Sequence, residues 1–438
     1  MQRREFIRLT GAAGVSVALA GCFGDGGDGG SDGSDGSGGS DGDSGDGGDG
    51  GGDDGASTGG GASPVTIGVL GPKSGPLSRL NSFYTANIEL AVDQINGGGN
   101  FVHDGGGLNV GGSTRGVEYV YYDTESKPNV GASAAERLIE QDGVSVVLGA
   151  MSSTTTLAIM DVLEREEVPG VTSVSVNEKI TGEEGNQWFF RNKDTDSMRA
   201  KFISQAIADE VGFDSVGMIG PNNDFGIGRM DAFADALGER GVETLTKQSF
   251  NQEAQSFLSE LESIKAEEPD ALYMVLNDPT HGVQMVPQAS QVGFDNMIGT
   301  GPLGTPQTPE KVGDPLGGTY IEITFPNEAK GTVDHVTTWA NDLEEATDGE
   351  VPPNYIGAPT YDAVNAIADS IGRAGEVAPG PIRDAMAGTS VLGVYPYPDF
   401  ALEFDGNNQA QVVAGLGQWQ KQDGEWRLTV QTGPFASN

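Results

Sequence analysis

Short apolar runs rich in β-forming residues alternate with stretches of helical spacing through most of this chain. The runs fall in two successive series, 65–70, 117–122, 144–148 and 168–172, and then 216–219, 242–249, 271–276 and 297–298. Alternation of this kind is typical of parallel sheets that helices cover on both faces. We therefore expect an α/β fold made of two doubly wound, Rossmann-like lobes.

The last part of the chain does not begin a third series. A strand is predicted over 320–325, helices over 333–343 and 361–371, and antiparallel strands over 401–404, 411–420 and 426–430. In the simplest arrangement the chain returns to complete the first lobe and then crosses again to complete the second. We expect lobe 1 to comprise residues 64–190 and 321–395, and lobe 2 to comprise residues 191–320 and 396–438.

Residues 1–21 have the features of an export signal. Arg3-Arg4 followed by Phe6-Ile7 matches the twin-arginine signal, and the apolar run that follows is too short to span a bilayer. The run ends in small residues before Cys22, like the site where a lipoprotein signal is cut and the thiol is lipidated. Since Cys22 is the only cysteine, we expect lipidation there; the alternative is a non-lipidated signal with an incidental cysteine.

Residues 22–63 consist almost entirely of Gly, Asp and Ser. Too few apolar side chains are present to offset the entropy of ordering, so we expect a disordered tether. The Gly-Gly-Asp pattern is similar to calcium-binding nonapeptide repeats, but it lacks the large apolar residue with which each such repeat builds a core. A solvated tether is therefore favoured over a calcium-ordered one.

Acidic residues far outnumber basic ones, 64 against 24, and the formal net charge is −40. Because Lys and Arg are the residues that bind phosphate backbones and anionic lipids, this balance excludes nucleic acid as a partner and argues against electrostatic docking on anionic lipid. Residues 64–438 alone carry a charge of −32, so the excess is spread over the folded part. Concentrated salt would screen the self-repulsion, which favours a halophilic protein over an ordinary acidic extracellular one.

Sequence motifs for catalysis and for cofactors are missing. The chain has no P-loop and no nucleophile elbow, and Gly226-Ile227-Gly228 is not followed by the third glycine of a dinucleotide fingerprint. Lipidation would use the only cysteine, and the three histidines lie far apart, which argues against a metal site. We therefore expect no enzyme activity, no cofactor and no metal.

Polar loops follow the predicted strands of both lobes, where doubly wound sheets bind ligands. Ser152, Ser153 and Thr154 follow the run at 144–148, and their hydroxyls at a helix start suit a carboxylate, although a Ser/Thr helix cap alone would have the same sequence. Phe225 suits either an apolar ligand part or a core position. The other candidates in equivalent loops are Ser74, Arg79, Val174, Ser175, Val176, Asn277 and Asp278.

A set of short segments spans the body of the chain in order: 67–69, 74–76, 91–99, 121–123, 135–139, 149–154, 190–191, 224–226, 361–364 and 404–407. Through them, residues 64–438 resemble the type I periplasmic binding proteins of ABC importers, of the branched-chain amino acid (Leu/Ile/Val) receptor kind, in a haloarchaeal lipoprotein form. The resemblance implies two lobes that are joined by three crossovers and close on a ligand. It also implies that Ser152 and Ser153 hold the carboxylate of an amino acid.

The sequence departs from that family at the ligand. Val176 aligns with a threonine of the amino acid binders and Phe225 with a tyrosine, and the glutamate that neutralises the ligand ammonium is replaced near Thr300-Gly301, which makes Gly301 a candidate as well. An uncompensated ammonium is costly to bury. The ligand is therefore not restricted to leucine, isoleucine or valine; an amide, a urea-like compound, an organic acid or an aromatic acid fits, and Arg79 would favour an anion.

The resemblance implies a solute-binding lipoprotein on the extracytoplasmic face of the membrane, exported by the twin-arginine route and anchored at Cys22. It would deliver a small polar ligand, such as a branched-chain amino acid or a related amide or carboxylate, to the membrane subunits of an ABC permease. We expect a monomer. The alternative is a ligand-binding receptor for a chemotaxis or signalling partner, because the same fold serves both roles.

Overall fold

Two mainly parallel sheets form the framework of the computed structural model, which describes residues 62–181, 187–305, 307–325 and 333–431. All of these residues belong to one contact unit, Gly59–Asn438. The predicted signal peptide, Cys22 and all but the last two residues of the predicted tether lie outside the described residues.

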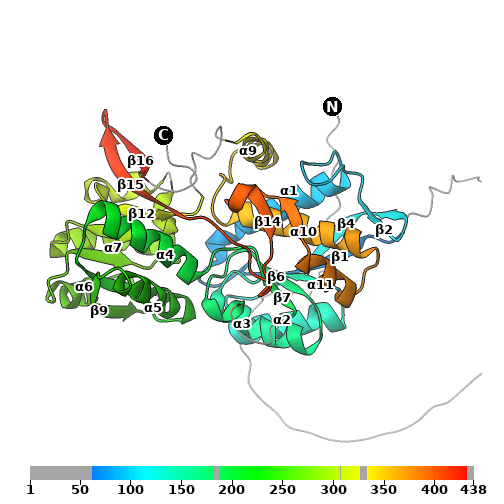
Figure 1. Ribbon diagram of the computed structural model, residues 1–438, viewed down its shortest axis with the longest axis horizontal. Coiled ribbons are helices and arrows are strands. Elements are labelled where there is room, and N and C mark those ends of the chain that lie inside the picture. Colours follow the sequence, from blue (N-terminus) through cyan, green and yellow to red (C-terminus); the bar gives the residue numbers. More distant parts are fainter. Residues whose placement is uncertain (1–61, 182–186, 306, 326–332, 432–438) are drawn as a thin grey trace, which may run out of the picture. The chain divides into compact units, whose positions relative to one another are not determined.

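The first sheet has five parallel strands in the order β4-β1-β5-β6-β7 (Figure 1). Its strands are β1 (Val65–Gly71), β4 (Val117–Asp123), β5 (Val147–Leu148), β6 (Gly170–Thr172) and β7 (Phe189–Arg191). Helices α1 (Asn81–Asn96), α2 (Pro128–Glu140) and α3 (Ser153–Arg165) cover it, and a small hairpin pairs β2 (Leu108–Val110) with β3 (Ser113–Arg115). The strand that we predicted over 144–148 is shorter, because only its last two residues pair.

The second sheet has seven strands in the order β16-β15-β12-β11-β10-β8-β9. Five are parallel: β8 (Ser215–Pro221), β9 (Glu243–Phe250), β10 (Ala271–Met274), β11 (Met297–Gly299) and β12 (Tyr320–Ile323). The antiparallel edge is formed by β15 (Gly415–Gln422) and β16 (Glu425–Val430). The accompanying helices are α4 (Asp196–Ala206), α5 (Asp224–Gly238), α6 (Leu258–Lys265), α7 (Pro279–Val292) and α8 (Thr308–Val312).

The segment between β12 and β15 packs on the first sheet. It contains α9 (Asp334–Ala346), α10 (Gly357–Ala374), α11 (Pro379–Ala387), β13 (Ser390–Leu392) and β14 (Ala401–Glu403). Helix α10 is buried on most sides because it packs against both α1 and α11 (Figure 1). The indole of Trp339 donates a 3.0 Å hydrogen bond to Asn87 Oδ1, which ties α9 to α1 as well.

The packing corrects two of the predicted lobe boundaries. We expected lobe 1 to resume at residue 321, but β12 pairs within the second sheet, and Ile321 and Ile323 lie in its core. We expected it to end at residue 395, but Leu402, Phe404 and Val412 lie in the core of the first sheet. The strand predicted over 401–404 therefore belongs to lobe 1, where β14 pairs with β13.

Within the described residues the chain accordingly crosses between the cores at three places. The first crossover is 192–195, between β7 and α4; the second is at Thr324, between Ile323 in one core and Phe325 in the other; the third is 413–414, just before β15. Below, lobe 1 means the described residues within 62–191 and 325–412, and lobe 2 those within 196–323 and 415–431. The second boundary escaped prediction because the apolar run at 320–325 contains the crossover.

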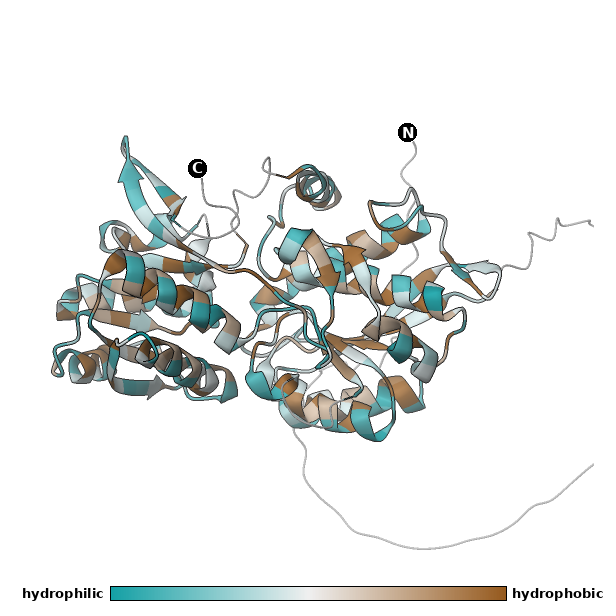
Figure 2. Ribbon diagram, in the orientation of Figure 1, coloured by the Kyte–Doolittle hydropathy of each residue, from teal (hydrophilic) through white to brown (hydrophobic). Residues whose placement is uncertain are grey.

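Apolar residues gather in the sheets and on the inner faces of the helices (Figure 2). In α1, Ile88, Ala91, Val92 and Ile95 recur at helical spacing and are all buried. Within the described part of the chain, every helix is too short or too polar to cross a membrane.

Candidate functional site

Loops at the carboxyl ends of the strands of both lobes line one cavity. The cavity offers about 80 Å³ to the centres of water-sized molecules, and since one water needs about 10–15 Å³ on that measure, it has room for a small solute. Its lining includes seven of the residues singled out from the sequence: Ser152, Ser153, Val174, Ser175, Val176, Phe225 and Asn277.

The start of α3 contributes two hydroxyl side chains to the lining of this cavity in lobe 1. Ser152 is the residue before the helix, and its hydroxyl makes no capping hydrogen bond, so helix capping does not explain the hydroxyl cluster. The first N–H groups of an α-helix have no partner within the helix and carry a partial positive charge. Ser152, the buried Ser153 and these N–H groups can therefore receive a carboxylate or another polar acceptor.

Five predicted ligand residues lie outside the lining of the cavity: Ser74, Thr154 and Gly301, and the pair Arg79 and Asp278. Ser74 is exposed, and its hydroxyl and N–H donate to the Asp123 carboxylate at 2.7 and 3.2 Å, which fixes the end of β4. Thr154 lies on the first turn of α3 outside the lining, and Gly301 lines a neighbouring cavity instead. These side chains lie in the predicted loops, but residues next to them in the sequence line the cavity instead.

Arg79 and Asp278 form a bridge between the lobes. Asp278 accepts the backbone N–H of Thr280 at 2.7 Å as the cap of α7, and it forms an ion pair with Arg79 of lobe 1. Arg79 also donates to the Thr280 hydroxyl at 2.7 Å. Its charge is therefore compensated by Asp278. Since Arg79 also lies outside the lining of the cavity, this geometry contradicts the expectation that it supplies the positive charge for an anionic ligand.

A second link between the lobes lies beside the cavity. Asn177 of lobe 1 donates through Nδ2 to the backbone carbonyl of Asp224 at 2.8 Å, at the start of α5. The same helix start is capped by Asn223, whose Oδ1 accepts the Gly226 N–H at 2.9 Å. Since Asn223 and Phe225 line the cavity, these bonds fix the lobe 2 wall relative to lobe 1.

Two buried cations in the cavity wall were missed by the sequence reasoning. Lys193 lies on the first crossover and Arg199 on α4, and both line the cavity. Lys193 follows β7 just as Ser152 follows β5, so its place after a strand was an available signal. In a chain this acidic, lysine and arginine side chains are expected at the surface. The burial of Lys193 and Arg199 is visible only in the folded structure.

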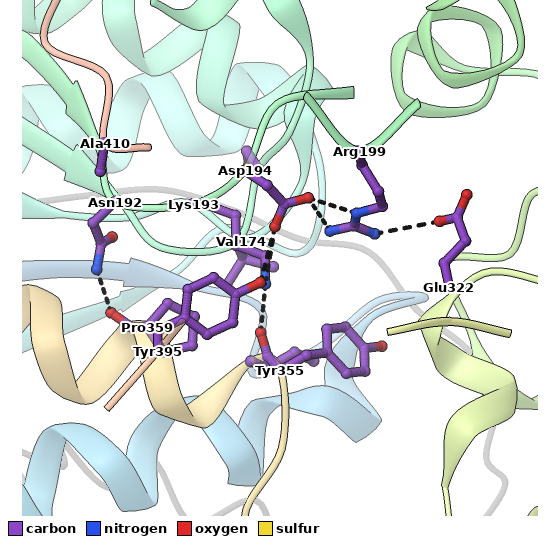
Figure 3. A network of polar contacts seen from close by, with 12 residues as sticks. Val174, Asn192, Lys193, Asp194, Arg199, Glu322, Tyr355, Pro359, Tyr395 and Ala410 are labelled. Atoms are coloured by element: carbon purple, nitrogen blue, oxygen red, sulfur yellow. Dashed lines mark hydrogen bonds and ion pairs between the residues drawn. The ribbon is translucent and has the colours of Figure 1, made fainter. Parts of the chain in front are cut away.

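These cations belong to a network of charged groups near the crossovers (Figure 3). Asp194 Oδ2 accepts a hydrogen bond of 2.5 Å from Arg199 Nε, and Asp194 Oδ1 accepts one of 2.9 Å from the Tyr395 hydroxyl. Burial alone would raise the pKa of Asp194, but Arg199 and Lys193 lower it to about 2. Asp194 therefore stays ionised at the centre of the network.

Arg229 on α5 completes the network on the lobe 2 side. Its guanidinium is fully buried and donates to Asp196 at 3.0 Å, to the Tyr273 hydroxyl at 3.0 Å and to Glu322. Burial raises the pKa of Asp196 to about 6, even though Arg229 opposes the shift. The network thus joins the first crossover to β12, next to the second.

A model of the periplasmic binding protein family matches residues 64–425. Among curated relatives, the leucine-, isoleucine-, valine-, threonine-, and alanine-binding protein of Pseudomonas aeruginosa is 24% identical over 328 residues, which cover 74% of this chain and 82% of the relative. A Leu/Ile/Val-binding protein homolog of Brucella melitensis is 24% identical over 71% of this chain and 79% of its own length.

Solved structures share the fold. A leucine binding protein from Thermotoga maritima superposes with a TM-score of 0.71 at 21% identity, covering 84% of this chain and 98% of its own. A solute binding protein of an ABC transporter from R. palustris in complex with benzoate has a TM-score of 0.70 at 17% identity, covering 83% and 95%.

Proposed function

This chain belongs to the periplasmic binding protein family, and from that premise we propose that it captures a small polar solute between its lobes and delivers it to an ABC permease. Members of this family are extracytoplasmic solute-binding proteins and not enzymes. The observation that carries the proposal is the cavity itself, which takes its lining from strand ends of both lobes and has room for a small molecule. Such a site is enclosed when two lobes close on a ligand.

The solute classes that we propose are amino acids, including branched-chain ones, and related amides and carboxylates. The names of the curated relatives above describe them as amino acid-binding proteins, and one structural neighbour was solved in complex with benzoate. The uncapped start of α3 with Ser152 and Ser153 supports a ligand with a carboxylate or carbonyl acceptor.

A thermal-shift screen tests this function. The purified protein is heated with amino acids, amides, urea or small carboxylates. The buffer contains multimolar KCl, because we propose that the acidic surface of the protein is adapted to concentrated salt. A bound solute stabilises the folded state by about 2.7 kcal/mol at one hundred times its dissociation constant, so the midpoint should rise with the logarithm of ligand concentration. If no solute in any of these classes moves the midpoint, the proposed function is wrong.

We also propose that the chain is exported by the twin-arginine route, anchored through a lipid on Cys22 and active as a monomer. Replacing Cys22 with serine should move the protein from the membrane fraction to the medium, because the proposed lipid on Cys22 supplies the apolar area that holds it at the bilayer. Replacing Arg3-Arg4 with two lysines is the companion variant and should leave the precursor inside the cell. Retention of the Cys22→Ser protein in the membrane fraction after a salt wash would disprove the lipid anchor.

A further inference from the structure

The charged side chains in the described lining of the ligand cavity are both basic. Lys193 and Arg199 both line it, with side chains that are 2% and 9% exposed. Among the described lining residues there is no aspartate or glutamate. The carboxylates nearest to the two cations, Asp194 and Glu322, are buried and do not line this cavity. A ligand therefore meets the cations and not their partners.

The ion pair of Lys193 with Asp194 is long, at 3.8 Å. Its ammonium donates to the Tyr355 carbonyl at 2.6 Å and to the Tyr395 hydroxyl at 2.5 Å, and both acceptors are neutral. The nearest carboxylate oxygen, on Asp194, is 3.8 Å away, and Arg199 and Tyr395 already hold that carboxylate (Figure 3). Burial of the ammonium lowers the pKa of Lys193 to about 7, although Asp194 opposes the shift. An anion in the cavity would give the Lys193 ammonium a closer counter-charge than Asp194 provides.

Arg199 has hydrogen-bond donors left for a ligand. Asp194 engages its Nε edge, while the nearest Glu322 oxygen is 3.7 Å from the other terminal nitrogen, beyond hydrogen-bond distance. A guanidinium carries five N–H donors in a rigid fork that matches a carboxylate. Asp194 therefore orients the group and leaves part of the fork unused.

The remainder of the cavity is mostly apolar. The side chains that argue for an apolar ligand body are those of Leu77, Leu80, Met151, Val176, Leu276 and Ile356. An ammonium group on the ligand would find no carboxylate among the described lining residues, and a buried ammonium without one is costly. The cavity thus favours an anion with a hydrocarbon part over a zwitterion.

Resting on the proposed function, we infer that the ligand is a small carboxylate with an apolar body and no ammonium group, and that Lys193 and Arg199 provide its counter-charge. This assigns to Lys193 of the first crossover and Arg199 of α4 the role that the sequence suggested for Arg79.

The first test uses the unaltered chain and probes of matched shape. 4-Methylpentanoate, 4-methylpentanamide and leucine share one hydrocarbon skeleton, and benzoate and benzamide share another. Calorimetric titration in multimolar KCl should give the carboxylates an affinity at least about tenfold above that of the matched amide or amino acid. Surface charges are screened within about 3 Å at such salt concentrations, so the preference must come from the cavity.

The second test removes the lysine charge. Lys193→Gln keeps a donor for the Tyr355 carbonyl and should weaken carboxylate binding by about tenfold or more, while it changes amide binding by less than about twofold. Lys73→Gln is the matched control, because Lys73 is an exposed lysine of lobe 1 outside the cavity. It should leave both affinities unchanged.

The pH dependence of binding gives a third readout. The charged and titratable groups around Lys193 are Asp194, Arg199, Arg229, Glu322, Tyr355 and Tyr395, with Asp362 bonded to the backbone N–H of Tyr395. Above pH 7 the free protein loses the Lys193 proton, so carboxylate affinity should fall by up to about tenfold per pH unit. Burial also raises the pKa of Asp362 to about 7, but Lys193→Gln retains Asp362, so a slope that vanishes in this variant belongs to Lys193.

The outcomes separate the inference from the function on which it rests. Leucine or an amide binding more tightly than the matched carboxylate overturns the inference and leaves the solute-binding function intact. An equal loss of carboxylate and amide affinity in Lys193→Gln also overturns it. If that variant does not fold, the matched probe pairs measured on the unaltered chain decide alone.

Discussion

Replacing Arg229 with methionine should lower the free energy of unfolding by about 3–5 kcal/mol, because it removes the cation from a buried pair and leaves the carboxylates behind. Asp196 and Glu322 both depend on this guanidinium, and both side chains are 0% exposed. Methionine is close in length, so little of the loss would come from an empty volume. Urea unfolding in concentrated KCl measures the change.

Lys247→Met in the same lobe is the control. Lys247 pairs with Asp231, but the two side chains are 40% and 56% exposed, so its loss should stay within about 0.5 kcal/mol. The deficit of Arg229→Met should also grow between pH 5 and pH 8. Burial already raises the pKa of Asp196 to about 6, so acid neutralises the orphaned carboxylate and relieves the variant. A loss of stability no larger than that of Lys247→Met, or a loss that becomes smaller as the pH rises, would contradict a buried charge network.

Replacing Gly226 with alanine should lower stability by about 1–3 kcal/mol through overpacking. An added Cβ would lie 2.0 Å from the Pro221 carbonyl oxygen and 2.7 Å from a carbon of its ring. Backbone cannot rotate out of the way, so the start of α5 must move away from the end of β8. Because Asn223 and Phe225 on that helix start line the cavity, the ligand-induced thermal shift should decrease as well.

Gly238→Ala provides the matched comparison at the other end of α5. A Cβ at that position meets no atom within 4 Å, and alanine is favoured over glycine in a helix by roughly 0.5–1 kcal/mol. This variant should be slightly more stable and should bind the ligand normally. If both alanines have the same effect, close packing at Gly226 does not position the site.

The alternation of apolar runs was enough to predict two doubly wound lobes, because each strand or helix is specified by its own local pattern. The runs at 216–219 and 271–276 became β8 and β10 within a residue or two. The crossover at Thr324 was missed because no local pattern specifies it. One continuous apolar run supplies Ile323 to one core and Phe325 to the other, and no turn residue marks the change.

The same difference between local patterns and long-range contacts decides which residues of the candidate site could be predicted. Ser152, Ser153 and Phe225 could be placed because ligands bind after the strands of such sheets, and they do line the cavity. Arg79 was assigned to the ligand because its partner, Asp278, lies 199 residues later in the sequence. Charge pairing over such separations depends on tertiary structure, so the sequence could not show that Arg79 is neutralised or that Lys193 is buried.

The packing of α10 on α1 has a consequence for the order of assembly during synthesis. Asn96 ends α1 and Gly357 begins α10, so the ribosome must add some 260 residues between them. At about 5–20 residues per second this takes roughly 13–52 s. For that time the side of α1 that packs on α10 has no native cover, although most of lobe 2 has already emerged. Lobe 1 can therefore finish folding only after nearly the whole chain exists, which favours completing the body before it leaves the cytoplasm.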